Sequence, residues 1–166
     1  MSEELVGVTA DELTRDRALA AALLDLNNAH AIELSWLEPE RLKHLVGQAF
    51  LAHRVGLGDA LLLAFDQDAD YDGVNFLWFR ERFPRFVYVD RVVVAATARG
   101  RGLAKKLYLD LFEKAKQAGH DRIVCEVNSS PPNPGSDAFH AALGFVQIGT
   151  GVLENGKTVS YLERRL

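Results

Sequence analysis

Apolar and polar residues alternate with two different spacings along the first part of this 166-residue chain. In residues 12–28 apolar side chains recur every three to four positions among helix-favouring residues, and residues 40–48 resume a helical pattern after a proline. Both segments are therefore predicted to be helices. Residues 49–53 and 60–65 are short apolar runs joined by the glycine-containing sequence at 55–59, which is typical of two strands in a hairpin.

The rest of the chain predicts strands and helices in turn, after a long connection over residues 66–84. A valine-rich strand at residues 86–94 leads through a glycine-containing loop into an amphipathic helix at residues 105–119. The chain then continues as a buried strand at residues 122–127 and a short helix at residues 136–143. It ends in a hairpin that turns at Asn155-Gly156, a strong hairpin signal.

Length and composition favour one compact domain, which we expect to span residues 1–166. Hydrophobic residues make up 48% of the chain and charged residues 25%, which is enough apolar surface for a buried core. The first residues contain no basic segment followed by an apolar stretch, and no window is continuously apolar for long enough to span a membrane. We therefore expect a soluble, cytoplasmic protein that does not interact with membranes.

Candidate metal ligands and disulfides are scarce in the sequence. The single cysteine, Cys125, cannot form an internal disulfide, and in the run RIVCEV it is either part of a strand core or a reactive thiol. No HxxxH pattern occurs around His30, His44, His53 or His120. No metal site is predicted.

The candidate chemistry centres on the loop between the valine-rich strand and the next helix. The first N–H groups of a helix lack partners and its N-terminal end is positive, so a loop at this place suits an anion. Arg99, Arg101, Lys105 and Lys106 concentrate positive charge in a chain whose net charge is −4. This local reversal of charge indicates a small polyanion as ligand. The alternative is a helix N-terminus that is exposed to solvent and binds no ligand, with a glycine that only allows the chain to turn.

Two common phosphate-binding motifs do not fit this loop. A P-loop requires Gly-Lys followed by Ser or Thr, and no such sequence follows Gly100 or Gly102. A Rossmann fingerprint would place its third glycine at Lys105, where a long cation is unsuited to close packing of helix on strand.

Residues 99–104 (RGRGLA) do fit the pattern R/Q-x-x-G-x-G/A, which resembles the pyrophosphate loop of the GCN5-related N-acetyltransferase (GNAT) superfamily. Residues 133–145 resemble the pattern N-x-x-A-x-x-x-Y-x-x-x-G-F of the same family, with Ser136 in place of alanine and His140 in place of tyrosine. The strand before the loop and the helix after it extend the resemblance over residues 86–145.

This resemblance implies a mixed α/β (α+β) fold, in which helices flank a mostly antiparallel central sheet and a strand-loop-helix unit cradles the pyrophosphate of acetyl-CoA. Gly102 would let the backbone approach the diphosphate, which a Cβ atom would push away. Asn133 would hydrogen-bond the cofactor arm, unless it only forms a turn before Pro134. The residues implied to bind the cofactor are Val92, Val93, Val94, Arg99, Gly100, Arg101, Gly102, Leu103, Ala104, Lys105 and Asn133.

The chemistry implied is the attack of an amine on an acetyl thioester, which needs a base for the amine and a proton for the departing thiolate. Asp90 is the candidate base because it interrupts an apolar strand at a position where similar enzymes hold an acidic residue. It could equally be paired with a cation such as Arg91. His140 could protonate the thiolate in place of the family tyrosine, or could pack against the cofactor or a loop.

The sequence therefore predicts an acetyl-CoA-dependent N-acetyltransferase that acts on a primary amine of a small molecule or a peptide. A non-catalytic acyl-CoA-binding or sensor domain is the alternative, because the family tyrosine is missing. The sequence has no basic tail, and no nucleic acid partner is expected. The edge of the terminal hairpin could pair with a second copy, which would make a homodimer.

Overall fold

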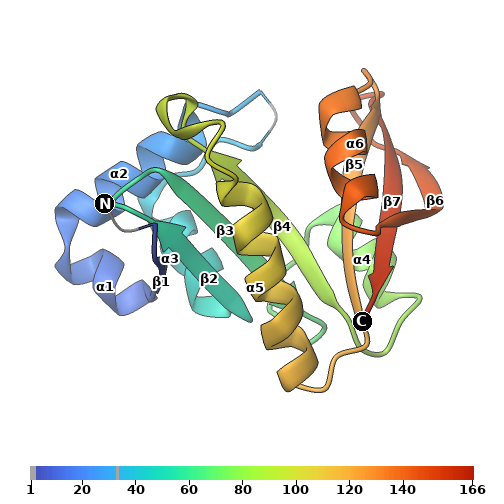
Figure 1. The fold of residues 1–166 in the computed structure, drawn as a ribbon, viewed down its shortest axis with the longest axis horizontal. Coiled ribbons are helices and arrows are strands. Elements are labelled where there is room, and N and C mark those ends of the chain that lie inside the picture. Colours follow the sequence, from blue (N-terminus) through green and yellow to red (C-terminus); the bar gives the residue numbers. More distant parts are fainter. Residues whose placement is uncertain (1–2, 33) are drawn as a thin grey trace.

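The computed structural model describes residues 3–32 and 34–166, which form a seven-stranded sheet flanked by helices (Figure 1). The strand order is β1-β2-β3-β4-β5-β7-β6, and every neighbouring pair is antiparallel except β4 and β5. The mixed, mostly antiparallel sheet expected from the sequence is confirmed. The strands are β1 (Leu5–Gly7), β2 (Leu51–Val55), β3 (Ala60–Asp66), β4 (Val87–Val94), β5 (Arg122–Ser130), β6 (Val146–Val152) and β7 (Thr158–Arg165).

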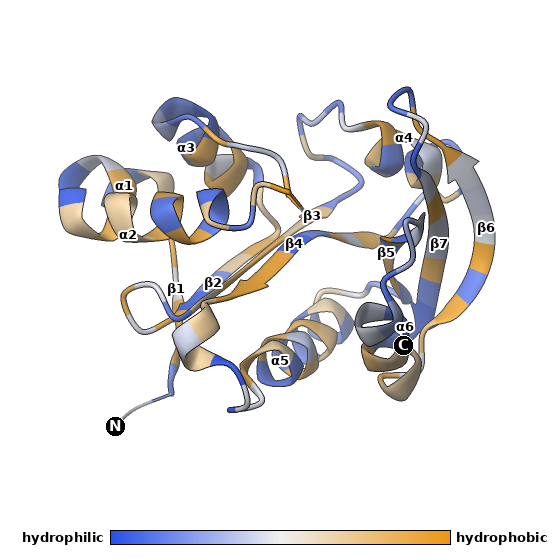
Figure 2. Cartoon of the chain, turned by 90° about the horizontal axis from the view of Figure 1, so that it is seen from above, coloured by the Kyte–Doolittle hydropathy of each residue, from blue (hydrophilic) through white to orange (hydrophobic). Residues whose placement is uncertain are grey.

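Helices cover both faces of the sheet, so the molecule has three layers (Figure 2). The helices are α1 (Ala10–Arg15), α2 (Arg17–Asn28), α3 (Pro39–Gln48), α4 (Val74–Arg80), η1 (Ala96–Ala98), α5 (Leu103–Gln117) and α6 (Pro134–Ala142). Successive residues of a strand point to opposite faces. Leu61 and Leu63 of β3 therefore lie in the core under α1–α4, whereas Leu62 and Ala64 lie in the core under α5 and α6.

Three elements differ from the sequence-based expectation. The helix predicted over residues 12–28 is two helices, because the backbone is extended at Asp16, whose side chain caps α2 by accepting a hydrogen bond from the Leu19 N–H. The connection over residues 66–84 contains α4, which buries Phe76 and Phe79, and β1 adds a short edge strand. Both elements are too short for a clear periodic pattern, so packing stabilises them more than local sequence does.

The strands β4 and β5 begin side by side and then diverge into a V (Figure 1). Their parallel pairing is limited to Val87 opposite Ile123 and Tyr88 opposite Val124. Just beyond, β4 has a bulge in which Asp90 is the extra residue, and a bulge bends and twists its strand. Within the described residues, no strand pairs with the β5-facing edge of β4 after Tyr88. That stretch of backbone is available for a ligand.

Two further observations concern the sequence-based expectations on membranes and metals. Among residues 3–32 and 34–166, no helix combines the length and apolar character needed to cross a membrane. The same residues bring together no group of three or more His, Cys, Asp or Glu side chains in positions to hold a metal ion. Cys125 is a free, buried thiol in the core beneath α5, as the strand-core interpretation expects.

Candidate active site

Two cavities meet where β4 and β5 diverge. One, of about 190 Å³, opens on the side of α5 and α6, and the other, of about 250 Å³, opens on the side of α4. They share four lining residues: Leu34, Asp90, Arg91 and Glu126. Groups that enter from opposite faces of the sheet can therefore meet at Asp90 and Glu126. This is the arrangement that a reaction between two substrates requires.

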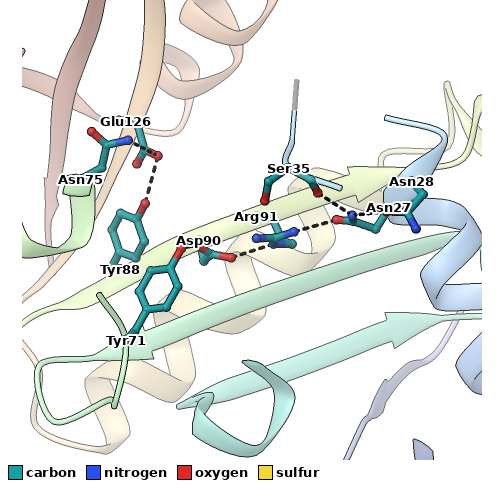
Figure 3. Close-up of polar contacts among 9 residues, drawn as sticks. All are labelled: Asn27, Asn28, Ser35, Tyr71, Asn75, Tyr88, Asp90, Arg91 and Glu126. Carbon is teal, nitrogen blue, oxygen red and sulfur yellow. Dashed lines mark hydrogen bonds and ion pairs between the residues drawn. The ribbon is translucent and has the colours of Figure 1, made fainter. Parts of the chain in front are cut away.

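Glu126 projects from β5 at the junction of the two cavities, and the sequence analysis did not single it out. Its Oε1 accepts hydrogen bonds from the Tyr88 hydroxyl at 2.9 Å and from Asn75 Nδ2 at 3.1 Å (Figure 3). Its Oε2 is enclosed and has no hydrogen-bond partner among the described residues. A buried polar atom without a hydrogen-bond partner lowers the stability of the folded chain unless a ligand forms a hydrogen bond with it.

The protonation of Glu126 is set mainly by its surroundings. Burial raises the pKa of its carboxyl from 4.5 to about 7, and the nearby Asp90 charge adds to that effect. The hydrogen bonds from Tyr88 and Asn75 act in the opposite direction, because they favour the ionised form. A carboxyl with this pKa can accept a proton near neutral pH, which is the property of a general base.

Asp90, the base expected from the sequence, has both carboxylate oxygens occupied. Oδ1 accepts a hydrogen bond from the Tyr71 hydroxyl at 2.7 Å, and Oδ2 lies 2.6 Å from Arg91 Nε in an ion pair (Figure 3). Arg91 Nη1 donates in turn to Asn27 Oδ1 at 2.8 Å, and Asn27 Nδ2 donates to the carbonyl of Ser35. The structure thus has the ion pair that the sequence left open as the alternative for Asp90.

His140, the acid expected from the sequence, is 6% exposed and has hydrogen bonds at both ring nitrogens. Nδ1 lies 2.8 Å from the carbonyl oxygen of Ser136, and Nε2 lies 2.9 Å from the hydroxyl of Tyr108 on α5. Burial lowers the pKa of His140, while the Ser136 carbonyl and the Asp137 charge partly offset this effect. The ring is therefore mostly neutral at neutral pH.

The loop predicted to cradle an anion leads into the N-terminus of α5. Gly100 and Gly102 have φ values of 82° and 70°, in the left-handed region that favours glycine. Gly102 is the N-cap of α5, and no side chain caps the helix there. A Cβ atom on either glycine would point into open space, so no other part of the described chain covers the backbone on that side. Leu103 is buried, and Ala104 follows in the first turn.

The cations around the cradle have different surroundings. Arg99 and Lys105 are exposed, with Arg99 Nη2 3.5 Å from His30 Nε2. Arg101 Nε donates to a carboxylate oxygen of Glu3 at 2.7 Å, so part of its charge is balanced from the start of the chain. Arg99 and His30 are 69 positions apart in sequence, and Arg101 and Glu3 are 98 apart, so only the fold brings each pair together.

Of the other residues predicted to bind the cofactor, Val92 lines the cavity on the α5 side, as does Asn133. Val93 is 4% exposed and belongs to the opposite core, whereas Val94 is partly buried on the α5 side. Asn133 Oδ1 accepts a hydrogen bond from the Ser136 N–H at 3.2 Å and is the N-cap of α6. The turn-forming role left open in the sequence analysis is therefore present, next to the cavity.

The structure thus brings Asp90, Val92, Asn133 and His140 to one cavity and places the glycine cradle at the start of α5. Sequence reasoning missed Glu126, whose signal is a lone carboxylate in the apolar run RIVCEV. It also assigned no hydrogen-bonding role to the polar residues that contact the predicted and newly found site groups. These are Tyr71, Asn75, Tyr88 and Tyr108.

Comparison with known proteins gives a consistent result. Residues 69–145 match the sequence model of the acetyltransferase (GNAT) family. The chain is 28% identical over 82 residues to L-2,4-diaminobutyric acid acetyltransferase of Wolinella succinogenes, covering 49% of this chain and 47% of that protein. It is 39% identical over 62 residues to a rice (Oryza sativa subsp. japonica) protein named "Probable glucosamine 6-phosphate N-acetyltransferase 2", covering 37% and 34% of the two chains. The matches thus span about half or less of these relatives.

Solved structures resemble the whole chain at lower identity. A chain of the NatC complex bound to Gag peptide and CoA superposes with a TM-score of 0.71 at 16% identity, covering 100% of this chain and 99% of that chain. The protein yncA of Salmonella typhimurium, solved with its cofactor acetyl-CoA, gives a TM-score of 0.69 at 16% identity, with coverage of 100% and 95%. At such identities the likeness shows a shared fold.

Proposed function

We propose that this chain belongs to the acetyltransferase (GNAT) family, whose sequence model residues 69–145 match, and that it is an acetyl-CoA-dependent N-acetyltransferase that acts on a primary amine of a small molecule or a peptide. The observation that carries the proposal is the unpartnered Oε2 of Glu126, at the place where cavities from both faces of the sheet meet. A domain that only binds acyl-CoA has no need for a buried carboxyl of this kind between two cavities.

The residues on the α5 side fit coenzyme A. The uncapped N–H groups at the start of α5 and the open space beside Gly102 suit a diphosphate. The unpaired edge of β4 beyond Tyr88 offers main-chain donors and acceptors to an amide-containing arm in the V. Bound acetyl-CoA would supply the acetyl thioester, which is the electrophile of the reaction.

Within this scheme Glu126 takes the proton from the acceptor amine. The amine must be neutral to attack, and a carboxyl with a pKa of about 7 is partly ionised at neutral pH and can accept the proton directly or through one water. Tyr88 and Asn75 hold Oε1, so the free Oε2 is the oxygen that can receive it. We assign Asp90 a positioning role, because Arg91 and Tyr71 already occupy its oxygens.

The acceptor is expected on the α4 side, where Tyr71, Asn75 and Tyr88 line the second cavity together with Val74 and Ser35. The relatives are named as an L-2,4-diaminobutyric acid acetyltransferase and a "Probable glucosamine 6-phosphate N-acetyltransferase 2", and the NatC structure contains a peptide. They support an amine acceptor in general. The volume of about 250 Å³ favours a compact amine or the end of a longer chain.

A panel of amines tests the proposed function directly. The purified chain is incubated with acetyl-CoA and with amino acids, amino sugars, diamines or short peptides, and both free thiol and acetylated product are measured. We expect stoichiometric thiol release with at least one acceptor, and Glu126→Gln should greatly reduce it. Tight CoA binding without acetyl transfer to any amine would instead support the non-catalytic acyl-CoA-binding alternative.

A further inference from the structure

Tyr108 carries a buried phenol that has no assigned role in the proposed reaction. It lies on α5, is 1% exposed, and lines the cavity on the α5 side together with His140 and Asn128. Rings of Phe112, Phe139 and Phe145 contact its ring at centroid distances of 5.5 to 6.0 Å. These contacts fix the ring, so the position of the hydroxyl is well determined.

The direction of the hydrogen bond between Tyr108 and His140 follows from the partners of the imidazole. Nδ1 lies 2.8 Å from the Ser136 carbonyl oxygen, which can only accept, so Nδ1 carries the hydrogen. Nε2 of the neutral ring then has a lone pair, and the Tyr108 hydroxyl 2.9 Å away donates to it. Both nitrogens of His140 are thereby used, whereas the Tyr108 oxygen has bonding capacity left.

The Tyr108 hydroxyl is also suited to donate to an anion. Burial raises the pKa of this phenol, so it keeps its proton throughout the neutral range. A hydroxyl hydrogen rotates toward the better acceptor, and a hydrogen bond to an anion is about twice as strong as one between neutral groups. An anion that develops in this cavity would therefore draw the hydroxyl away from the neutral imidazole.

We propose that Tyr108 donates the proton to the departing sulfur and that His140 is a positioning residue that orients the Tyr108 hydroxyl. This inference rests on the proposed acetyl transfer. In that step the amine nitrogen bonds to the acetyl carbon, the carbon–sulfur bond breaks, and its electron pair remains on sulfur. The Tyr108 O–H bond then breaks as the S–H bond forms, and the phenolate regains a proton from water. Glu126 passes the proton of the amine to solvent.

The test is the pKa of the thiol of bound CoA, because a hydrogen-bond donor stabilises the thiolate whether or not turnover occurs. Thiolate absorbance is titrated in the CoA complex, and the complex with desulfo-CoA serves as the baseline. Burial raises the pKa of Cys125, so this thiol does not contribute at neutral pH. Tyr108→Phe keeps the aromatic contacts and should raise the bound-thiol pKa by about one to two units. Its kcat should fall with little change in CoA affinity.

Other titratable or charged groups around this cavity are Asp90, Arg91, Cys125, Glu126 and His140, and Tyr108→Phe retains all of them. The matched control is Tyr161→Phe, which removes another buried phenol, on β7, whose hydroxyl bonds Asn75. It should leave the pKa of the bound thiol unchanged. His140→Ala should raise that pKa less than Tyr108→Phe does, because Tyr108 remains present but loses its orientation.

The outcomes separate this inference from the proposed function. Failure of the wild-type chain to bind CoA would overturn the proposed function itself. If CoA binds but Tyr108→Phe leaves the thiol pKa unchanged, the inference about Tyr108 is wrong while acetyl transfer can still stand. If the pKa of the bound thiol rises in His140→Ala but not in Tyr108→Phe, His140 is the direct donor. That result would also overturn the inference.

Discussion

Glu126 and Asp90 are two carboxylates with different environments at one junction. Arg91 balances the charge of Asp90, whereas Glu126 receives only neutral donors and has one free oxygen. Burial without a cation explains why the pKa of Glu126 rises to about 7. The difference gives each residue a distinct signature in the pH dependence of catalysis.

The first prediction uses that signature. Because Glu126 must be ionised to accept a proton, kcat/KM of the wild-type chain should rise with pH to a plateau above about 7. Glu126→Gln should lower kcat/KM by about 10²- to 10⁴-fold and remove this rise. The measurement is the pH profile of thiol release at subsaturating amine and saturating acetyl-CoA, which gives kcat/KM for the amine.

Asp90→Asn is the informative comparison for this profile. It weakens the pairing with Arg91 but leaves Glu126 in place, so activity should fall while the rise with pH remains. A variant on the exposed surface of α5, Glu113→Gln, should leave the profile as it is in the wild type. If the rise of kcat/KM with pH is lost in Asp90→Asn but retained in Glu126→Gln, then Asp90 is the base.

At the scale of elements, the cradle is a property of the loop between β4 and α5. Its backbone conformation depends on two glycines in the left-handed region, and the first turn of α5 has no side-chain cap. Gly156 provides a natural reference, because it has a φ of 82° in the terminal hairpin and also faces open space. The cost of adding a methyl group at Gly102 or Gly156 is therefore mainly conformational strain, about 1–2 kcal/mol for each residue.

The second prediction follows from this matched pair. CoA should raise the melting temperature of the wild-type chain, with a stabilisation of about 2.7 kcal/mol at a concentration of 100 times Kd. Gly102→Ala and Gly156→Ala should lower the melting temperature of the free chain to a similar extent. Only Gly102→Ala should reduce the added stabilisation by CoA, because its methyl group points to the diphosphate. An equal CoA response in both variants would be evidence against the cradle.

The molecule as a whole places its two cavities on opposite faces of one sheet. The V between β4 and β5 connects them, and Asp90, the bulged residue in the pairing of β4 with β3, lines both cavities. This arrangement requires polar groups such as Glu126 and Arg91 inside the layers. The pairing of Arg91 with both Asp90 and Asn27 shows how the fold accommodates a buried guanidinium.

The third prediction concerns the pH dependence of global stability. Between pH 4.5 and about 7 the folded chain retains a proton on Glu126 that the unfolded chain has released. The free energy of unfolding should therefore fall as pH rises through this window, by at most about 3 kcal/mol from this residue. Glu126→Gln keeps a neutral side chain, so the variant should gain stability relative to the wild type as pH rises.

Chemical denaturation at pH 5 and pH 8 measures this difference. The comparison uses the change in stability between the two pH values within each protein, which cancels the effect of the substitution on packing. Glu113→Gln should show the wild-type dependence. If the wild type and Glu126→Gln lose stability in parallel between pH 5 and pH 8, the carboxyl of Glu126 has an ordinary pKa in the folded chain.

The sequence by itself determined the features that depend on neighbouring residues. The glycines and cations of residues 99–104 predicted a loop between a strand and a helix, and the structure has this loop between β4 and α5, with Gly102 as the N-cap of the helix. The turn at Asn155-Gly156 and the cap at Asn133 are local in the same way. Such features follow from backbone conformation and from hydrogen bonds within a few residues.

Only the tertiary structure decided which carboxylate has the properties of a base. Glu126 meets Tyr88 and Asn75 across 38 and 51 positions of sequence, and its pKa reflects the burial that these contacts create. The ion pair of Asp90 with Arg91 links sequence neighbours, but only the tertiary structure showed that Tyr71 also hydrogen-bonds Asp90 and that Arg91 also donates to Asn27. Burial and long-range pairing set proton affinities, and both arise only when distant segments pack together.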